Sequence, residues 1–359
     1  MEKLFGYDAL AAFARLVFKK MGCSDDDATL AIKVLLSADL RGIDSHGIAR
    51  LSGYYRLYEA GRINPKPDVR IVHETPSTAS VDGDSGLGLV VAPKAMQVAI
   101  DKAEKVGSGW VSVKNSNHFG IAGYHAMMAL EHNMIGWAMT NASALVAPTF
   151  ARERMLGTNP ICVAIPAGEE PAFVADFATT TAANGKLEIL QRKEADAPEG
   201  WVVDGDGNST HDAHILKKGG MMLPLGSDRE HGSHKGYALG SIVDIFSAVL
   251  SGASYGPWAP PFPAYVPMPD NMPGDGLGHF LGAMRIDGFR PADDFKKHMD
   301  NWIERFRSAK TVEGQPRVLI PGDPEREMTE ERFQKGIPLN AKVEEDLKDL
   351  AEKLGLKFS

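Results

Sequence analysis

Three stretches in the first sixty residues place apolar side chains every three or four positions, which is the period of an amphipathic helix. The predicted helices cover residues 8–22, 25–41 and 44–61. A serine followed by three aspartates can cap the second helix, and Asp44 or Ser45 can cap the third. The pattern therefore predicts a small helical subdomain at the N-terminal end.

Later in the chain, short apolar runs alternate with helical stretches. The runs typical of strands are 69–72, 77–81, 110–113, 135–140, 161–165, 173–176 and 280–286. Helical spacing predicts helices over 93–106, 121–131, 237–250, 295–309 and 343–354. This mixture predicts an α/β or α+β body with helical caps.

The longest uncharged run, Ile245 to Pro269, raises the question of a membrane span. Its second half is too rich in Pro and Gly to hold a helix. We therefore expect the helix at 237–250 to be buried in the protein and residues 253–278 to form a long Pro-rich loop.

Composition narrows the class of protein. The chain has 359 residues and a formal net charge of −8 at pH 7, so nucleic acid and anionic membranes are disfavoured as partners. The first residues lack the apolar run of a secretory signal. Cys23 and Cys162 could in principle pair, but two cysteines in a chain this long are typical of reduced thiols. We expect a cytoplasmic protein.

Two polar clusters contain the candidate chemistry. His118 lies in the stretch 115–125, between a predicted strand and a predicted helix. His46 and Arg50 are four residues apart, so a helix beginning at Ser45 would place them on one face. An imidazole can move a proton near neutral pH, and a guanidinium can grip a carboxylate. We expect the clusters to meet in one pocket for a small hydroxy acid, although each alone could be an ordinary helix cap or βα loop.

The usual nucleotide-binding fingerprints are missing. Gly83-x-x-Gly86-x-Gly88 has the reverse order of a Rossmann fingerprint and is interpreted as a turn before a helix, and there is no Walker A motif. Hydroxyl-rich turns at 156–160 and 176–181 are nevertheless suited to ribose and phosphate. Residues 232–237 open a helix whose N–H groups, with Lys235, would suit a pyrophosphate. Each of these signals alone could be capping chemistry.

A metal site is not expected. His46, His118 and His234 could conceivably bind zinc, but the chain has neither H-E-x-x-H nor a Cys/His pattern with ligand spacing.

Five segments in this order resemble the type-2 malate/L-lactate dehydrogenase family. They are Asp44-Ser45-His46-Gly47, Asn117-His118, Leu156-Gly157-Thr158-Asn159-Pro160, Asp176-Phe177-Ala178-Thr179 and His234-Lys235-Gly236-Tyr237. The family also includes ureidoglycolate and L-sulfolactate dehydrogenases, diketogulonate reductases and cyclic-imine reductases. The resemblance runs from about residue 10 to about residue 325. It implies a non-Rossmann NAD(P)-binding fold with a mixed, largely antiparallel sheet, and a homodimer with active sites near the interface.

The resemblance also implies roles for individual residues. The catalytic acid/base candidates are His46 and His118. Substrate binding is implied for Ser45, Arg50 and Thr158. Cofactor binding is implied for Ser143, Asp176, Phe177, Ala178, Lys235, Gly322 and Asp323. We expect a helical subdomain of residues 1–75, joined by 315–359, and a cofactor-binding sheet domain of residues 76–314.

The expected activity is NAD(P)-dependent interconversion of a small 2-hydroxy acid, of the malate or L-lactate type, and its 2-oxo acid. NAD is favoured and NADP stays open. Alternatives within the family are reduction of a diketo sugar acid or a cyclic imino acid, and oxidation of ureidoglycolate. From other classes, a small-acid binding protein without turnover and a metal-dependent hydrolase are the alternatives. Residues 205–229 and 253–278 depart from the family pattern and could alter the mouth of the pocket.

Overall fold

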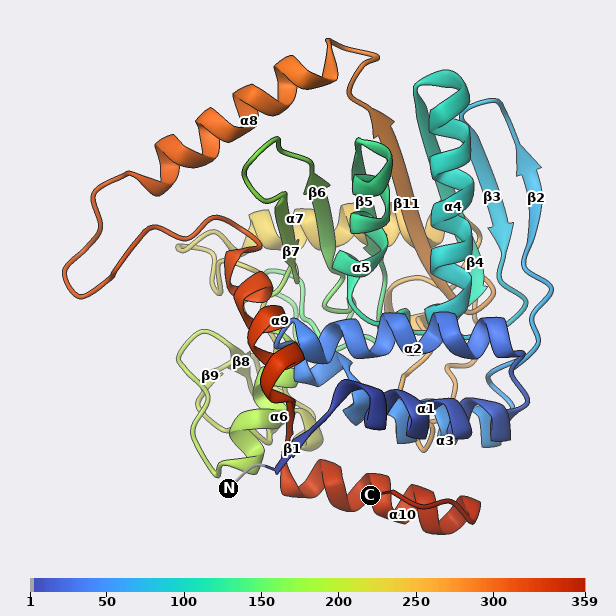
Figure 1. The fold of residues 1–359 in the computed structure, drawn as a ribbon. Helices are drawn as coiled ribbons and strands as arrows, with labels where there is room; N and C mark the ends of the chain where they lie inside the picture. Colours follow the sequence, from blue (N-terminus) through green and yellow to red (C-terminus); the bar gives the residue numbers. More distant parts are fainter. Residues whose placement is uncertain (1–2, 359) are drawn as a thin grey trace.

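The computed structural model describes residues 3–358, and its centre is a seven-stranded sheet (Figure 1). The strand order is β2-β3-β4-β11-β5-β6-β7, and every neighbouring pair is antiparallel except β3 and β4. The strands are β2 (Arg70–Glu74), β3 (Thr78–Asp82), β4 (Ser108–Ser116), β11 (Leu277–Arg285), β5 (Met134–Thr140), β6 (Ile161–Ile165) and β7 (Phe173–Phe177). The expected mixed, largely antiparallel sheet is confirmed.

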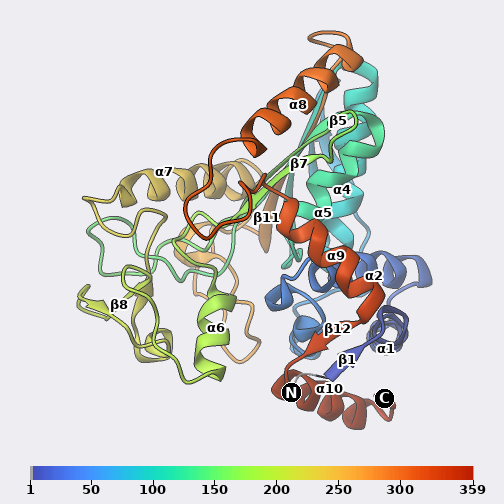
Figure 2. The ribbon, with the colours of Figure 1, turned by 60° about the vertical axis from the view of Figure 1, so that its left-hand side comes forward.

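Helices pack on both faces of this sheet (Figures 1 and 2). They are α4 (Gly88–Val106), α5 (Ala122–Met127) with the 3-10 turn η3 (Met128–His132), and α7 (Ser233–Asp244) with the π-helical turn η5 (Ile245–Val249). Ala138 of β5 lies in the core that includes α4 and α5, whereas its neighbour Met139 packs with α7. Gly109 lets α4 approach β4 closely, because a Cβ there would lie 1.9 Å from the Ala99 carbonyl oxygen.

A second core joins the two ends of the chain. Strand β1 pairs with β12 in antiparallel register, and side chains of α1, α2, α3 and α10 fill one hydrophobic cluster. The elements are β1 (Lys3–Phe5), α1 (Tyr7–Met21), α2 (Asp25–Leu40), α3 (Leu51–Glu59), α9 (Asp323–Lys335), β12 (Ile337–Leu339) and α10 (Ala341–Leu354). The division into domains at residues 75 and 315 stays a prediction.

The segment 205–229, which matched no pattern, belongs to a small unit with its own core. Its elements are α6 (Asn184–Arg192), β8 (Val202–Val203), β9 (Ser209–Thr210), the 3-10 turn η4 (Ile215–Lys218) and β10 (Met221–Met222). A hairpin tip at 204–208, as the Asp-Gly-Asp-Gly-Asn sequence favours, joins β8 to β9. Two further elements are α8 (Ala292–Arg307), which projects from the sheet in Figure 1, and a 3-10 turn, Gly256–Trp258.

Two helix predictions need correction. Pro93 does not open its helix, because α4 already begins at Gly88 and contains the proline. The helix at 237–250 is not buried all round: Val243 is buried, but Phe246 and Leu250 are 42% and 58% exposed. It lies on the outside of the sheet, so only one side of it is covered. Among residues 3–358, no helix has both the length and the apolar character needed to cross a bilayer.

Candidate active site

The structure brings His46 and His118 together from distant parts of the chain. Their imidazole rings are stacked, with centroids 5.4 Å apart and planes inclined by 27°. Arg50 lies close enough for its charge to act on both rings. The expected meeting of the two clusters is therefore present in the fold, and the catalytic and binding roles stay predictions.

The segment that holds His46 is not the continuous helix expected from Ser45. Two 3-10 turns, η1 (Asp44–His46) and η2 (Ile48–Arg50), come first, and α3 begins at Leu51. Between them the buried carboxylate of Asp39 accepts a hydrogen bond of 2.7 Å from the Ile48 N–H. It also occupies the space that a Cβ on Gly47 would need. This contact lies where the two 3-10 turns meet.

Hydrogen bonds from the side chain of Asn117 hold the turn that carries His118. The Nδ2 atom of Asn117 donates to the carbonyl oxygens of Arg62, Ser85 and Gly86, at 3.0–3.2 Å. A Cβ on Gly88 would lie 2.1 Å from the Asn117 carbonyl oxygen. The stretch Gly83-x-x-Gly86-x-Gly88, which we interpreted as a turn, therefore has a second effect. Its last residue, Gly88, allows the chain to approach Asn117 closely, next to His118.

Tyr54 was missed by the sequence reasoning. Its side chain is fully buried, and its hydroxyl is 2.7 Å from Nδ1 of His118. The Gly120 N–H, which can only donate, also approaches Nδ1 at 3.4 Å. Nδ1 is therefore an acceptor, and Nε2 of His118 carries the proton. The available signal was spacing, since Tyr54 follows Arg50 by four residues.

Removing the Tyr54 hydroxyl should slow turnover with little loss of stability. We expect Tyr54→Phe to lower kcat about tenfold, because one hydrogen bond worth roughly 1–1.5 kcal/mol no longer orients His118. Tyr58→Phe, on the same helix, is the matched control and should leave kcat unchanged. Steady-state kinetics with a thermal melt would measure both effects. Equal kcat values for the two variants would exclude an orienting role for Tyr54.

Both imidazoles are neutral at physiological pH. Shielding from water, followed by the positive charge of Arg50, lowers the pKa of His46 to about 4. Shielding from water, followed by the influence of His46, holds the pKa of His118 well below its usual value. A neutral imidazole is ready to accept a proton, and a carboxylate bound beside Arg50 would favour the protonated form.

This depressed pKa predicts the pH dependence of 2-hydroxy acid oxidation. Only neutral His46 can act as the base, so kcat/KM should stay level as the pH falls from about 8 to about 5. It should then decrease with a midpoint near 4, the pKa of His46. A midpoint near the ordinary histidine value of 6.5 would contradict this prediction.

Arg50 is held by contacts on two sides. Its Nε donates to the Ser45 carbonyl oxygen at 2.5 Å. Its Nη2 lies 3.1 and 3.2 Å from the two carboxylate oxygens of Glu188, on α6. Ser45 is also 2.9 Å, Oγ to Nδ1, from His46. Glu188 was not predicted, because nothing in its local pattern shows that α6 reaches this site.

The Pro-rich loop delivers an aromatic ring to the same cluster. The Phe262 ring lies 5.0 Å from the His118 ring and 5.4 Å from the Tyr54 ring, and the Arg50 guanidinium is 5.5 Å from it. Its backbone N–H donates to Oγ of Ser143 at 3.0 Å. The loop therefore forms one wall of the site.

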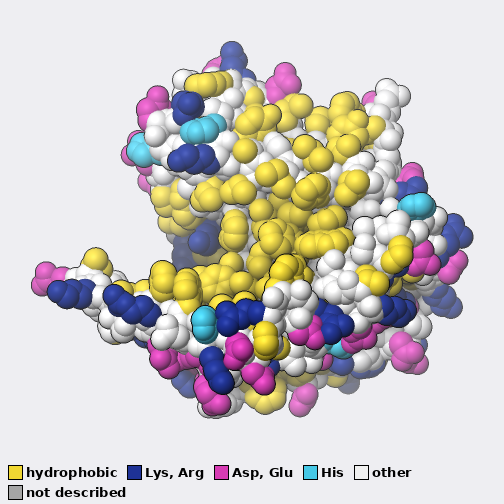
Figure 3. Space-filling view, turned by 90° about the horizontal axis from the view of Figure 1, so that it is seen from above, with side chains coloured by type: hydrophobic (Ala, Val, Ile, Leu, Met, Phe, Trp, Pro, Cys, Tyr) yellow, Lys and Arg dark blue, Asp and Glu magenta, His cyan; other side chains and the backbone are white. Residues whose placement is uncertain are grey.

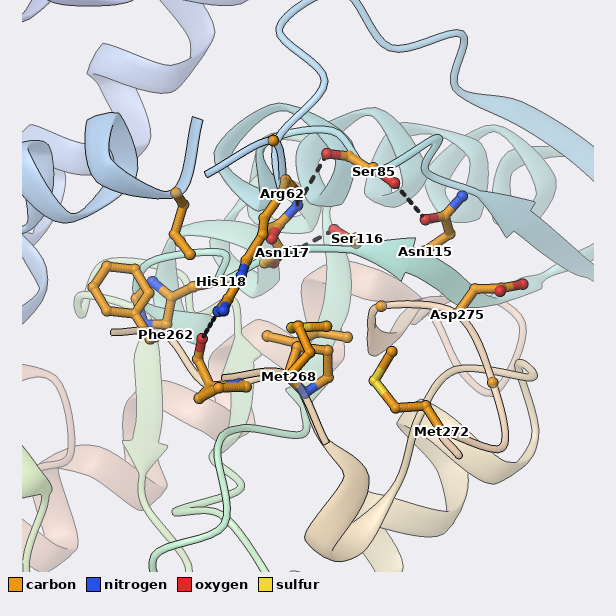
Figure 4. Close-up of a pocket in the computed structure, with 17 residues that line it drawn as sticks. Arg62, Ser85, Asn115, Ser116, Asn117, His118, Phe262, Met268, Met272 and Asp275 are labelled. Atoms are coloured by element: carbon orange, nitrogen blue, oxygen red, sulfur yellow. Dashed lines mark hydrogen bonds between the residues drawn. The ribbon is translucent and has the colours of Figure 1, made fainter. Parts of the chain in front are cut away.

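A cavity of about 280 Å³ lies next to His118 (Figure 4). Its walls come from the end of β4 and from the Pro-rich loop, including Met268, Met272 and Asp275. Arg62 points into it and donates to the carbonyl oxygens of Pro261 and Val266. Arg62 thus holds the Pro-rich loop by hydrogen bonds on both sides of Phe262.

Apart from Ser143, which contacts the Pro-rich loop, the residues predicted to bind the cofactor lie in two places. Asp176 and Phe177 are the last two residues of β7, and Ala178 follows it: Asp176 accepts a 2.7 Å hydrogen bond from the Gly123 N–H, and Phe177 is 41% exposed. Thr158, which was predicted to bind the substrate, lies just before β6. Partial burial raises the pKa of Asp176 to about 6. The Thr158 carbonyl oxygen accepts from the Thr179 N–H at 3.0 Å.

The other predicted cofactor residues begin two helices. Lys235 is in the first turn of α7, and Gly322 precedes α9. The Asp323 carboxylate caps the turn at Ile320 and pairs with Arg326 and Arg307, at 3.2 and 3.5 Å. No described contact joins Lys235, Gly322 or Asp323 to the histidine pair. Across residues 3–358, no group of three or more His, Cys, Asp or Glu side chains is arranged to hold a metal ion.

Known proteins are similar to this chain in both sequence and fold. The sequence pattern of the malate/L-lactate dehydrogenase family matches residues 5–348. A malate dehydrogenase of Pyrococcus horikoshii is 42% identical over 98% of this chain and 95% of its own length. An L-sulfolactate dehydrogenase of Methanocaldococcus jannaschii is 38% identical over 95% and 94%. The crystal structure of Entamoeba histolytica malate dehydrogenase superposes with a TM-score of 0.92 at 33% identity, covering 99% of both chains. The chain therefore belongs to the malate/L-lactate dehydrogenase family, whose dehydrogenases use nicotinamide cofactors.

Proposed function

We propose that this protein interconverts a small 2-hydroxy acid and its 2-oxo acid, with His46 and His118 moving and holding the proton and Arg50 binding the carboxylate. The observation that carries the proposal is the stacked pair of neutral imidazoles beside one guanidinium. A site that only binds an acid needs the guanidinium but not two groups able to transfer protons.

In the oxidation direction, Arg50 fixes the carboxylate. Nδ1 of His46 lies 2.9 Å from Ser45 Oγ; in the proposed tautomer Nδ1 donates to this oxygen, and Nε2 takes the hydroxyl proton. Nε2–H of His118 donates to the same substrate oxygen, while its Nδ1 is occupied by Tyr54. Ser45 and Thr158 would complete the contacts to the substrate. When bound, a nicotinamide would accept the hydride that leaves C2 of the substrate. In the reverse direction the same imidazole returns the proton.

The start of α7 fits the phosphates of a nicotinamide dinucleotide. No side chain caps this helix. The N–H groups of Ser233 and Lys235 already donate to the carbonyl oxygens of Asp228 and Gly232, and the helix dipole favours an anion at this end. Lys235 lies in this turn. Next to it, Nη1 of Arg229 is 3.0 Å from Nδ1 of His234. Ser143, Asp176, Phe177, Ala178, Gly322 and Asp323 would line the remainder. We favour NAD over NADP, and parallel assays with each cofactor would decide.

A substrate panel tests the proposed reaction. Nicotinamide absorbance would be followed with oxaloacetate, pyruvate, sulfopyruvate, a diketo sugar acid and a cyclic imino acid, each with NADH and NADPH, and with ureidoglycolate in the oxidation direction. Since similar proteins are named malate and L-sulfolactate dehydrogenases, we expect oxaloacetate or sulfopyruvate to be turned over fastest. Faster turnover of the cyclic imino acid or diketo acid would place the enzyme among the family's reductases. No turnover of any member by folded protein would refute the proposal.

We also propose that the protein is a homodimer. Figure 3 shows hydrophobic side chains gathered over a broad, hollowed face. Exposed apolar residues on α7, η5 and the residue after it are Ile242, Ile245, Phe246, Val249 and Leu250, each 42–58% exposed. Soluble monomers rarely leave so large a contiguous apolar surface in water. A second copy of the chain is the partner we expect.

Negative charge introduced on this apolar face should separate the two copies of the proposed dimer. We expect sedimentation to give twice the mass of one chain for the wild-type protein and one chain mass for Val249→Asp/Leu250→Asp, because a buried unpaired carboxylate is costly. Phe333→Asp, at an exposed phenylalanine on α9, is the control. A wild-type monomer would contradict the dimer.

We retain the cytoplasm as the proposed location. Both thiols, Cys23 and Cys162, are free and buried, as suits a reducing compartment. Fractionation of source cells would test this.

A further inference from the structure

We propose that Glu188 of α6 is a positioning residue for substrate binding: it holds Arg50 so that one nitrogen of the guanidinium stays directed to the substrate carboxylate. The inference rests on the proposed function and extends it to an element that the histidine clusters do not include.

The donors of Arg50 are divided among different partners. Nε is used by the Ser45 carbonyl oxygen. Nη2 is used by Glu188, whose two oxygens both lie on this one nitrogen, at 3.1 and 3.2 Å. Among residues 3–358, no hydrogen-bond partner contacts Nη1. Glu188 therefore does not occupy the whole fork of the guanidinium, and Nη1 is left for an incoming carboxylate.

Glu188 is itself held in place by its own helix. Asn184, one turn earlier, donates to Oε1 at 3.1 Å, and Arg192, one turn later, lies 3.7 Å from Oε2. These contacts offset part of the negative charge of Glu188. The repulsion that Glu188 exerts on a substrate carboxylate is correspondingly reduced, so its positioning effect should prevail.

The first turn of α6 is also pressed against the segment that carries His46. A Cβ on Gly185 would lie 2.1 Å from Cβ of Ser45, so only glycine fits this approach. Gly185 and Glu188 are three residues apart and thus lie on one face of α6. That face contacts both Ser45 and Arg50. α6 also follows the segment that begins at Asp176, so the helix connects the expected cofactor segment to the substrate-binding arginine.

The test compares two substitutions that separate hydrogen bonding from charge. We expect Glu188→Ala to raise KM for the 2-oxo acid about tenfold, with kcat changed less than about threefold and KM for the nicotinamide cofactor unchanged. Glu188→Gln retains an acceptor for Nη2, so it should restore part of the loss. Glu199→Ala, at an exposed glutamate beyond α6, is the control, and thermal melts would confirm that all variants fold.

Two other KM results would overturn the proposal. If Glu188 instead competed with the substrate for Arg50, both variants would lower KM, and that would overturn the proposal. An unchanged KM in Glu188→Ala would overturn it as well. Lack of turnover in the wild-type enzyme would refute the proposed function itself, whereas normal wild-type turnover with either of these KM results would refute only the role of Glu188.

Discussion

Replacing His46 or His118 with alanine should lower kcat for the 2-oxo acid by about 10²–10⁴-fold, which is the usual contribution of general acid–base catalysis. The two rings are stacked at 5.4 Å and both are neutral, so neither can replace the other without moving. We expect the larger loss for His46→Ala, because in this direction its Nε2 gives the proton to the substrate oxygen. His118→Ala removes a hydrogen bond to the same oxygen.

The control for this prediction is His132→Ala. His132 is on the surface, where it pairs with Glu104 at 2.9 Å, and its loss should leave kcat unchanged. Single-turnover rates would keep product release from masking the chemical step. A larger loss for His118→Ala than for His46→Ala would reverse the two roles, and near-normal turnover in both variants would disprove the catalytic assignment.

The second large effect is on substrate affinity. Arg50→Ala should raise KM for the 2-oxo acid about 100-fold, since charge-assisted hydrogen bonds to a carboxylate are worth roughly 3 kcal/mol and each 1.4 kcal/mol is tenfold. KM for the nicotinamide cofactor should change little. Arg50→Lys keeps the charge but loses the planar fork, so an intermediate KM is expected.

A surface arginine supplies the comparison. Arg56 is in α3, six residues after Arg50, and pairs with Asp346 at 3.3 Å. Arg56→Ala should leave both Michaelis constants unchanged. If Arg50→Ala weakened cofactor and substrate binding equally, the guanidinium would not be the specific carboxylate anchor that we propose.

Much of the sheet could be predicted because each strand depends on its own pattern. The run at 161–165 coincides with β6, and the runs at 135–140 and 173–176 lie within β5 and β7. Period-2 alternation reports which side chains face the core, and this signal is local. The mixed order of the strands was available only from the resemblance, because pairing between distant strands leaves no mark in either strand's pattern.

The helix at 237–250 shows where local pattern fails. Its apolar residues recur at helical spacing, as a buried helix requires, yet Leu250 is 58% exposed. A surface that another chain covers in a permanent complex can be nearly as apolar as a surface covered by its own chain, and we propose that a second copy covers this one. Only the position of the helix on the outside of the sheet distinguishes the two cases.

The sequence by itself determined the residue types of the site: two histidines, an arginine and hydroxyl-rich turns, in an order typical of one family. Only the tertiary structure decided which groups surround them. Tyr54, Glu188 and Phe262 reach the cluster from α3, α6 and the Pro-rich loop. The physical reason is that burial and hydrogen bonding between segments far apart in the chain arise from packing, and these contacts set both the low pKa of His46 and the direction of Arg50.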